Sequence, residues 1–398
     1  MAASDAFERR FGRKPGPATR LSALGREPRA QHGFVNTPIY RGSTVLFPTL
    51  DALTAYSAEY TYGRRGTPTT RALEEAIAAL ENGAKTFLAP SGLAAVAAAL
   101  TAFASPGDHI LVADAVYHPT RRFCDTTLKR LGVETEYYDP RHSADAAARV
   151  RANTRLIFAE SPGSNTFEVQ DLPALAAIAR SAGLWLMADN TWASPLYCRP
   201  LDLGADVSIQ SATKYITGHS DVMLGAVTVN DRAAPVMRVY HETAGLCASP
   251  EDCFLAARGL RTLSARLERH WRSGLAVAEW LRTRPEILRV LHPALPDDPG
   301  HALWRRDFTG ASGLFGVVLR PAPHEALAAM LDGLTLFGMG YSWGGFESLA
   351  VPFDPRSCRT ATPWMEDGWV LRLHIGLEEP EDLIADLEAG LDRFSERR

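Results

Sequence analysis

A lysine set between hydroxyl-bearing residues is the most chemically suggestive feature of this 398-residue sequence. The stretch Ser208–Asp221, SIQSATKYITGHSD, places Lys214 directly after Thr213 and three residues after Ser211. Lysine, unlike arginine, can lose its proton when buried and attack a carbonyl group to form a Schiff base. The two hydroxyls suit a phosphate ester, and the ordinary alternative is a snorkelling or salt-bridged lysine. Arginine supplies most of the 42 basic residues, and the only lysines are Lys14, Lys85, Lys129 and Lys214.

The spacing S-x-T-K-Y-x-x-G-H-x-D resembles the cofactor-lysine motif of the Cys/Met-metabolism family, which contains pyridoxal 5'-phosphate (PLP) enzymes of fold type I. The resemblance implies that Lys214 holds PLP as a Schiff base and that Ser211 and Thr213 bind the cofactor phosphate. It also implies an α/β fold in which a large domain with a mostly parallel sheet carries a smaller C-terminal α/β domain. Further parts of a PLP site are then expected upstream.

Three upstream segments match those parts. LWLMADNTW ends an apolar strand on Asp189, which the resemblance assigns to the pyridine nitrogen, whose protonation lets the ring accept a carbanion's electrons. APSGLAAV begins a helix at Gly92 and Leu93, whose backbone N–H groups can face a phosphate. In ADAVYHPT, the resemblance assigns Tyr117 as the ring that stacks on the cofactor. Tyr117 and Lys214 are therefore the two catalytic candidates. Each has an ordinary alternative: a turn aspartate, a helix start and a packed tyrosine.

The segment EYTYGRRGTPTT resembles an arm that reaches the cofactor of a neighbouring subunit. The resemblance assigns Tyr62 and Arg64 to that phosphate, and arginine suits the role because its planar guanidinium can donate two parallel hydrogen bonds. The ordinary alternative is a solvated basic turn. On this assignment each active site needs two chains, so we expect a homo-oligomer and specifically a tetramer.

The expected binding site for the substrate carboxylate lies in the C-terminal part of the chain. WVLRLHIGLEEPEDL places Arg372 between two leucines, so its side chain leaves a strand on the opposite face from theirs. A salt bridge to a nearby acid is the alternative. GMGYSWGGFESL adds Ser342 and Trp343 as substrate-binding candidates and resembles the bacterial cystathionine β-lyases within the family. The chain departs from the family at Ser164, where asparagine is common beside the ring oxygen, and at Phe254, where the β-lyases have tyrosine.

The reaction that the resemblance implies is β-elimination from cystathionine, a step of methionine biosynthesis. The Lys214 amine would remove the Cα proton, and breakage of the C–S bond would give homocysteine, pyruvate and ammonia. Cystine or other cysteine S-conjugates as substrates, and the γ-lyase or γ-synthase chemistry of related branches, stay open. The non-enzyme alternative is a catalytically silent PLP-binding regulator, against which the joint presence of Lys214, Asp189 and Arg372 argues.

Other enzyme classes find little support in the sequence. A dinucleotide-dependent oxidoreductase needs GxGxxG after its first strand, and the nearest match, GMGYSWGG, occurs late in the chain with the wrong spacing. The eleven histidines are dispersed, so no metal site is expected. A net charge of -4 gives no electrostatic reason to expect nucleic acid or an anionic membrane as a partner.

The elements that must position these residues follow from the alternation of short apolar segments with helical ones. HILVADA, RLIFAES, LWLMADN and DVSIQS read as strands between helices, a pattern typical of βαβ units and a largely parallel sheet. We expect an extended N-terminal arm over residues 1–62, a PLP-binding large domain over 63–256 and a small domain over 257–398. Ligands of such sheets bind at the C-terminal ends of the strands, where Asp189 lies.

The composition is that of an ordinary globular protein, with 46% apolar and 22% charged residues. The five cysteines are odd in number and scattered, which argues for free thiols in a reducing compartment. The uncharged, mostly apolar run over residues 92–104 is too short to span a bilayer, and the N-terminus has no apolar signal core. We therefore expect a cytoplasmic enzyme whose Arg-rich opening is a mobile arm.

Overall fold

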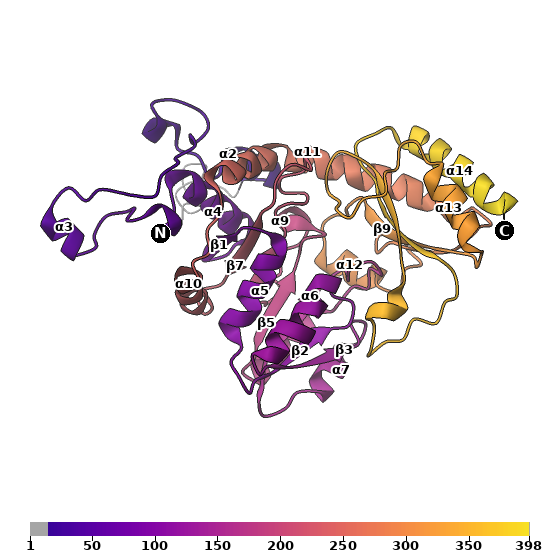
Figure 1. The fold of residues 1–398 in the computed structure, drawn as a ribbon, viewed down its shortest axis with the longest axis horizontal. Helices are drawn as coiled ribbons and strands as arrows, with labels where there is room; N and C mark the ends of the chain where they lie inside the picture. The colour runs from indigo at the N-terminus through magenta and orange to yellow at the C-terminus, as the bar shows by residue number, and fades with distance from the viewer. Residues whose placement is uncertain (1–14, 398) are drawn as a thin grey trace.

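The computed structural model describes residues 15–397, so the first 14 residues, with Lys14 and most of the Arg-rich opening, lie outside the described part. Figure 1 shows an α/β body built around strands β1 to β7 and a second body around β9. The long helix α11 (Pro250–Leu281) runs from one body to the other. A segment that carries the short helix α3 (Leu50–Thr54) projects away from both bodies.

The first body contains a seven-stranded, mostly parallel sheet, as the sequence predicts. Strand β7 runs antiparallel to both of its neighbours, β1 and β6, and all other strand pairs are parallel. Strands β2 and β7 are buried along their whole length, because helices cover both faces of the sheet. In sheet order the strands are β1 (Lys85–Ala89), β7 (Gly225–Val229), β6 (Val207–Gln210), β5 (Trp185–Asp189), β4 (Thr154–Glu160), β2 (His109–Ala113) and β3 (Glu134–Tyr138).

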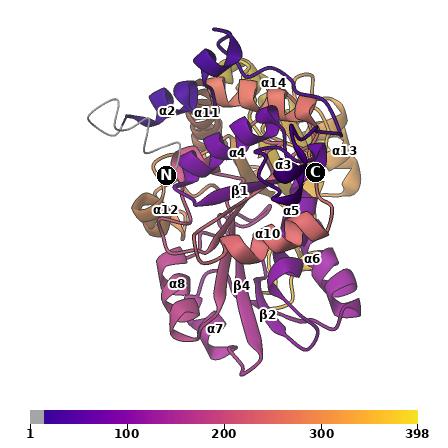
Figure 2. The same cartoon turned by 90° about the vertical axis from the view of Figure 1, so that its left-hand side faces the viewer.

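Helices flank this sheet on two sides, with α7 and α8 on one and α6 and α10 on the other (Figure 2). Their ends follow local sequence signals. Helix α4 begins after Thr67, whose hydroxyl accepts the N–H of Thr70 in a capping box, and α8 begins after Asp171, which accepts the N–H of Ala174. The helices of this body are α4 (Pro68–Glu81), α5 (Gly92–Phe103), α6 (His118–Phe123), α7 (Ser143–Ala148), α8 (Leu172–Ser181), α9 (Ser194–Tyr197) and α10 (Ala234–Thr243).

The second body is built on a separate four-stranded antiparallel sheet with strand order β10-β11-β9-β8. Its strands are β8 (Ile287–Leu291), β9 (Leu314–Leu319), β10 (Leu349–Phe353) and β11 (Val370–His374). Helices α13 (His324–Asp332) and α14 (Pro380–Glu396) pack with α11 over this sheet around a second apolar core. Helix α11 is continuous through residue 256, and a domain division at residues 62/63 and 256/257 stays a proposal.

The N-terminal region is only partly extended. Helix α2 (Pro17–Ala23) packs on α11 through the buried side chains of Leu21 and Leu24. Arg261 of α11 donates to both backbone carbonyls, Leu21 O and Leu24 O, at 2.7 Å each. Strands β1, β3, β7, β8 and β10 are not predicted from the sequence patterns. Within residues 15–397 no helix has the length and apolarity that a membrane crossing needs.

Candidate active site

Lys214 lies in the turn that follows strand β6, facing a loop of the second body. Its Nζ donates to Ser342 Oγ at 2.7 Å and lies 5.4 Å from the centre of the Trp343 ring. Burial lowers the pKa of the Lys214 amine to about 8, and the positive charge of Arg372 adds to this, whereas Asp189 opposes it. About a tenth of the amine is therefore neutral at pH 7, far more than for an ordinary lysine, and attack on a carbonyl or removal of a proton requires that neutral form.

Asp189 ends strand β5, next to the strand that leads to Lys214. Its Oδ1 accepts from the N–H and the hydroxyl of Thr191, at 2.9 and 2.5 Å. Burial raises the pKa of Asp189, against the opposing effects of Thr191 and Lys214. Thr191 also accepts the N–H of Ser211 at 2.9 Å, which ties the carboxylate to the lysine turn. No hydrogen bond to Oδ2 is recorded among residues 15–397, so this oxygen is available to a protonated ring nitrogen.

Helix α5 and the lysine turn together form a cradle for an anion. The N–H groups of Gly92 and Leu93 occupy the first turn of α5, where no intrahelical acceptor exists, while Ser91 caps Ala94. A Cβ added to Gly92 would lie 2.4 Å from Ser211 Oγ, so the helix start touches the Ser211 hydroxyl. Converging N–H groups and a hydroxyl at a helix N-terminus fit a phosphate. Thr213 Oγ1 is hydrogen-bonded to the Leu224 backbone in this structure.

Tyr117 stands at the start of helix α6, with 45% of its surface exposed toward the site. Its N–H donates to Glu160 Oε2 at 2.7 Å. Glu160 ends strand β4 and pairs in register with Asp189 of β5, so two carboxylates lie side by side. Burial and then the charge of Asp189 raise the pKa of Glu160 well above its usual value. Sequence reasoning missed Glu160, although RLIFAES ends a predicted strand on an acid, as LWLMADN does.

Arg372, on β11, is the cation of the site. Its Nη2 donates to the carbonyls of Ser342 and Gly340 at 3.1 and 3.4 Å. Among residues 15–397 it forms no salt bridge, so the acids of EEPED do not neutralise it. Burial lowers the pKa of Arg372 to about 10, which leaves it charged at neutral pH. A partly buried cation without a carboxylate partner, close to a reactive lysine, fits the carboxylate of an amino-acid substrate.

Tyr62 and Arg64 are not brought together with these residues in one chain. Tyr62 immediately precedes the short turn Gly63–Arg65, and Arg64 lies within it, between helices α3 and α4. Arg64 donates to the carbonyl of Glu242 on α10 at 2.9 Å, and Tyr62 is 44% exposed. No contact of either residue with Lys214 is recorded in the described part of the chain. Their assignment to a partner's cofactor stays a prediction.

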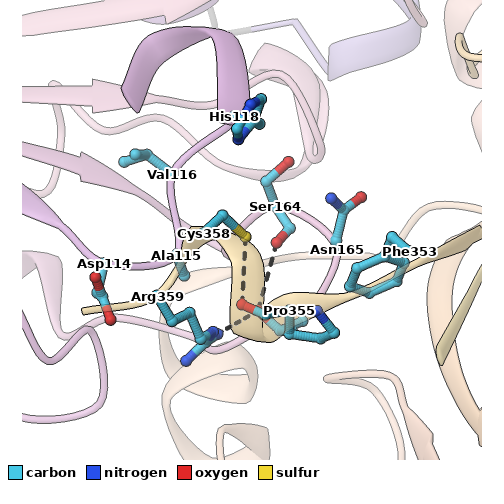
Figure 3. A pocket seen from close by; sticks show the side chains of 11 residues that line it. Asp114, Ala115, Val116, His118, Ser164, Asn165, Phe353, Pro355, Cys358 and Arg359 are labelled. Atoms are coloured by element: carbon cyan, nitrogen blue, oxygen red, sulfur yellow. Dashed lines mark hydrogen bonds between the residues drawn. The ribbon is translucent and has the colours of Figure 1, made fainter. Parts of the chain in front are cut away.

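The two departures from the family pattern lie at different places. Ser164 lines a small cavity together with His118, Cys358 and Arg359 (Figure 3). Phe254, on α11, lines another cavity, whose remaining walls come mainly from the N-terminal segment and α4. Within one chain Phe254 therefore faces the N-terminal segment.

Comparison with known sequences identifies the family. A profile described as "Cys/Met metabolism PLP-dependent enzyme" matches residues 18–392. The chain belongs to this family. Its cofactor is accordingly PLP, and the residues described above fit that group: a lysine with a lowered pKa, a buried carboxylate and an anion cradle.

Similar proteins cover nearly the whole chain. A protein of Rhizobium johnstonii, provisionally named a cystathionine β-lyase, is 52% identical over 94% of this chain and 95% of its own length. Cystathionine β-lyase MetC of Escherichia coli is 44% identical over 94% of this chain and 98% of its own length. The crystal structure of MetB from Corynebacterium glutamicum has a TM-score of 0.89 at 34% identity and covers 95% and 98% of the two chains. The fold-type I architecture predicted from the sequence is thereby confirmed.

The relatives do not all have the same activity. A Wolbachia pipientis protein named L-alanine/L-glutamate racemase is 40% identical over 94% of this chain and 96% of its own length. Racemisation and elimination both begin with removal of the Cα proton. Membership of the family therefore does not determine which reaction follows removal of the Cα proton.

Proposed function

We propose that this protein is a PLP-dependent carbon–sulfur lyase that cleaves cystathionine by β-elimination into homocysteine, pyruvate and ammonia. The observation that carries the proposal is the contact of Lys214 with Ser342, beneath Trp343 and close to Arg372, because it joins a base to a carboxylate-binding cation. The choice of cystathionine as the substrate rests on the relatives named as β-lyases, at 44% and 52% identity.

Each residue of the site has one task in this reaction. PLP, when bound, withdraws electrons from the Cα atom of the amino acid attached to it. Asp189 holds a proton on the pyridine nitrogen, because its buried negative charge stabilises the cation beside it. The neutral fraction of Lys214 takes the proton from Cα, and Lys214 can later pass that proton to the leaving sulfur. Tyr117 packs against the ring.

Substrate orientation falls to Arg372 and the loop beside it. A guanidinium binds a carboxylate through two parallel hydrogen bonds, which fixes direction as well as distance. With the α-carboxylate held there, the Cα–H bond and the neighbouring Cβ–S bond can both lie within reach of Lys214. Ser342 and Trp343 close this side of the site, and the ring excludes water from Lys214.

The active enzyme is proposed to be a homo-oligomer, with a tetramer as its full form. The projecting N-terminal segment exposes large apolar side chains that a second chain would cover: Phe34 (69% exposed), Leu46 (86%), Leu50 (73%) and Tyr56 (53%). Tyr62 and Arg64 lie at the end of this segment and would then reach the partner's cofactor phosphate. A reducing cytoplasm, where methionine biosynthesis would take place, suits the five free cysteines.

Product analysis separates this proposal from its rivals. The purified enzyme is incubated with PLP and L-cystathionine, and the keto acid is identified by mass spectrometry. We expect pyruvate with an equal amount of homocysteine. Mainly 2-oxobutyrate and cysteine would indicate γ-elimination instead, and faster turnover of cystine would change the substrate alone.

A parallel incubation with L-alanine and L-glutamate, followed by chiral chromatography, tests racemisation. D-isomers formed without any keto acid from cystathionine would contradict the proposal. Bound PLP with neither activity would favour a regulator.

A further inference from the structure

A second side chain of β11, His374, holds the same loop as Arg372. Residues two apart on a strand face the same side, so both side chains leave β11 toward the loop of residues 340–345. Arg372 donates to the carbonyl of Ser342 at 3.1 Å. His374 Nε2 lies 3.1 Å from the backbone N of Gly344 and accepts its hydrogen. One strand thus binds this loop at two successive points.

The loop rests directly on the lysine turn. Lys214 donates to the hydroxyl of Ser342 at 2.7 Å. Gly344 adopts a φ of +87°, and a Cβ there would lie 2.9 Å from both the carbonyl carbon of Lys214 and the backbone nitrogen of Tyr215. Only a glycine can make this approach. A small displacement of Gly344 would therefore move the hydroxyl that Lys214 binds.

His374 belongs to a buried cluster of rings beneath the loop. It is fully buried, and its ring centre lies 5.2 Å from that of His270 and 6.0 Å from that of Tyr215. Burial, with His270 adding, holds the pKa of His374 well below its usual range, so the imidazole stays neutral and can accept a hydrogen bond. The same Nε2 lies 3.2 Å from the carbonyl oxygen of Gly345, so either neutral tautomer binds the loop.

We propose that His374 is a positioning residue that, by binding the backbone of Gly344, holds Ser342 and Trp343 against Lys214. It touches neither substrate nor cofactor in this role. The inference rests on the proposed role of Lys214 as the amine that carries PLP. Burial is the main cause of the lowered pKa of Lys214, and the loop contacts that amine through Ser342 and Trp343, so a loosened loop should return the pKa toward its ordinary value.

The test titrates Lys214 in the protein without cofactor. Reductive methylation with ¹³C-formaldehyde labels only four lysine side chains and the N-terminus, so NMR can follow Lys214 alone, with the other three lysines as internal references. His374→Gln places an acceptor near the position of Nε2, whereas the shorter side chain of His374→Asn cannot reach Gly344. We expect the Gln variant to titrate as the parent does, and the Asn variant to titrate at higher pH. In the loaded enzyme we expect kcat/KM to fall about tenfold for Asn and little for Gln.

His270→Leu is the packing control, because it removes a ring of the same cluster without touching the loop backbone. The proposal would be overturned if Lys214 had the same pKa in the Asn variant as in the parent. It would also be overturned if His270→Leu raised the pKa of Lys214 as much as His374→Asn does. His374→Leu adds a second loss-of-acceptor variant, and the Gln/Asn pair decides the matter if the leucine variant does not fold. Elimination that persists in Lys214→Ala would overturn the proposed function alone, since the titration requires no reaction.

Discussion

Lys214 owes its chemistry to neighbours that lie far from it along the chain. Its hydrogen-bond acceptor, Ser342, is 128 residues away, and the second cause of its lowered pKa, Arg372, is farther still. Lys214→Ala should lower pyruvate formation from cystathionine by at least about 10³-fold, because it removes the amine that is proposed to take the Cα proton. Lys129→Ala, which changes an exposed lysine elsewhere, is the control. Near-normal pyruvate production by Lys214→Ala would mean that the residue is not the base.

The pH dependence of cofactor capture follows from the same amine. Only neutral Lys214 can attack the PLP aldehyde, and the neutral fraction rises through a pKa of about 8. The rate at which the protein without cofactor takes up PLP should therefore rise with pH between about 6 and 8 and level off above about 9. Stopped-flow absorbance measures this rate. A rate still climbing steeply at pH 10 would imply an ordinary lysine.

Arg372 offers a test of substrate binding rather than chemistry. Arg372→Leu removes a charge-assisted pair with the substrate carboxylate, worth about 1.5–3 kcal/mol. KM for cystathionine should rise roughly ten- to hundredfold, with a smaller change in kcat. Steady-state kinetics checks this, and PLP content serves as the control for an intact cofactor site. An unchanged KM would leave Arg372 as a clamp for the loop alone.

At the scale of elements, helix α4 places one carboxylate beneath strand β6. Glu81 is fully buried; its Oε1 accepts from Ser208 and Gln210 at 3.1 and 2.8 Å, and its Oε2 has no recorded partner. Burial raises the pKa of Glu81 to about 7. The folded-state pKa thus lies above the unfolded value of about 4.3, so stability is greatest at low pH and is lost as pH rises through about 7.

Glu81→Gln removes this loss, because an amide cannot ionise. We expect the variant to match the parent near pH 4, below the unfolded pKa, and to be more stable at pH 8 by about 1–3 kcal/mol. Urea denaturation at the two pH values measures the difference. Glu388→Gln, a change on the exposed face of α14, should show no such dependence. A variant less stable than the parent at pH 8 would show that the charged form is well accommodated.

At the scale of the whole molecule, the active site is proposed to join residues of two chains. Arg64→Ala and Lys214→Ala should each be inactive or nearly so. In a mixed dimer both defects fall in one site, and the other site is intact. Co-refolding equal amounts should therefore restore about a quarter of the native activity, since about half of the dimers are mixed. Lys214→Ala refolded by itself gives the baseline activity. If the mixture shows no activity above that baseline, Arg64 does not contribute to the partner's site.

Several features were predictable because their signals are local. The strands β2, β4, β5 and β6 and the helices α6 and α8 follow from apolar periodicity and from caps such as Asp171. Strand β3 was not predictable in this way, because ETEYY is an edge strand with polar residues on its exposed side. Strand β7 runs antiparallel in a parallel sheet, which no pattern of its own residues indicates.

The sequence by itself determined the family and the candidate reacting groups, because short motifs around Lys214, Asp189 and Arg372 resemble the PLP site of that family. Only the tertiary structure decided how these groups act on one another. It placed Glu160 beside Asp189, His374 beneath the loop and Ser342 on the lysine amine. Hydrogen bonding, burial and charge interactions depend on distance in space, and in this fold these three contacts join residues 29 or more positions apart along the chain.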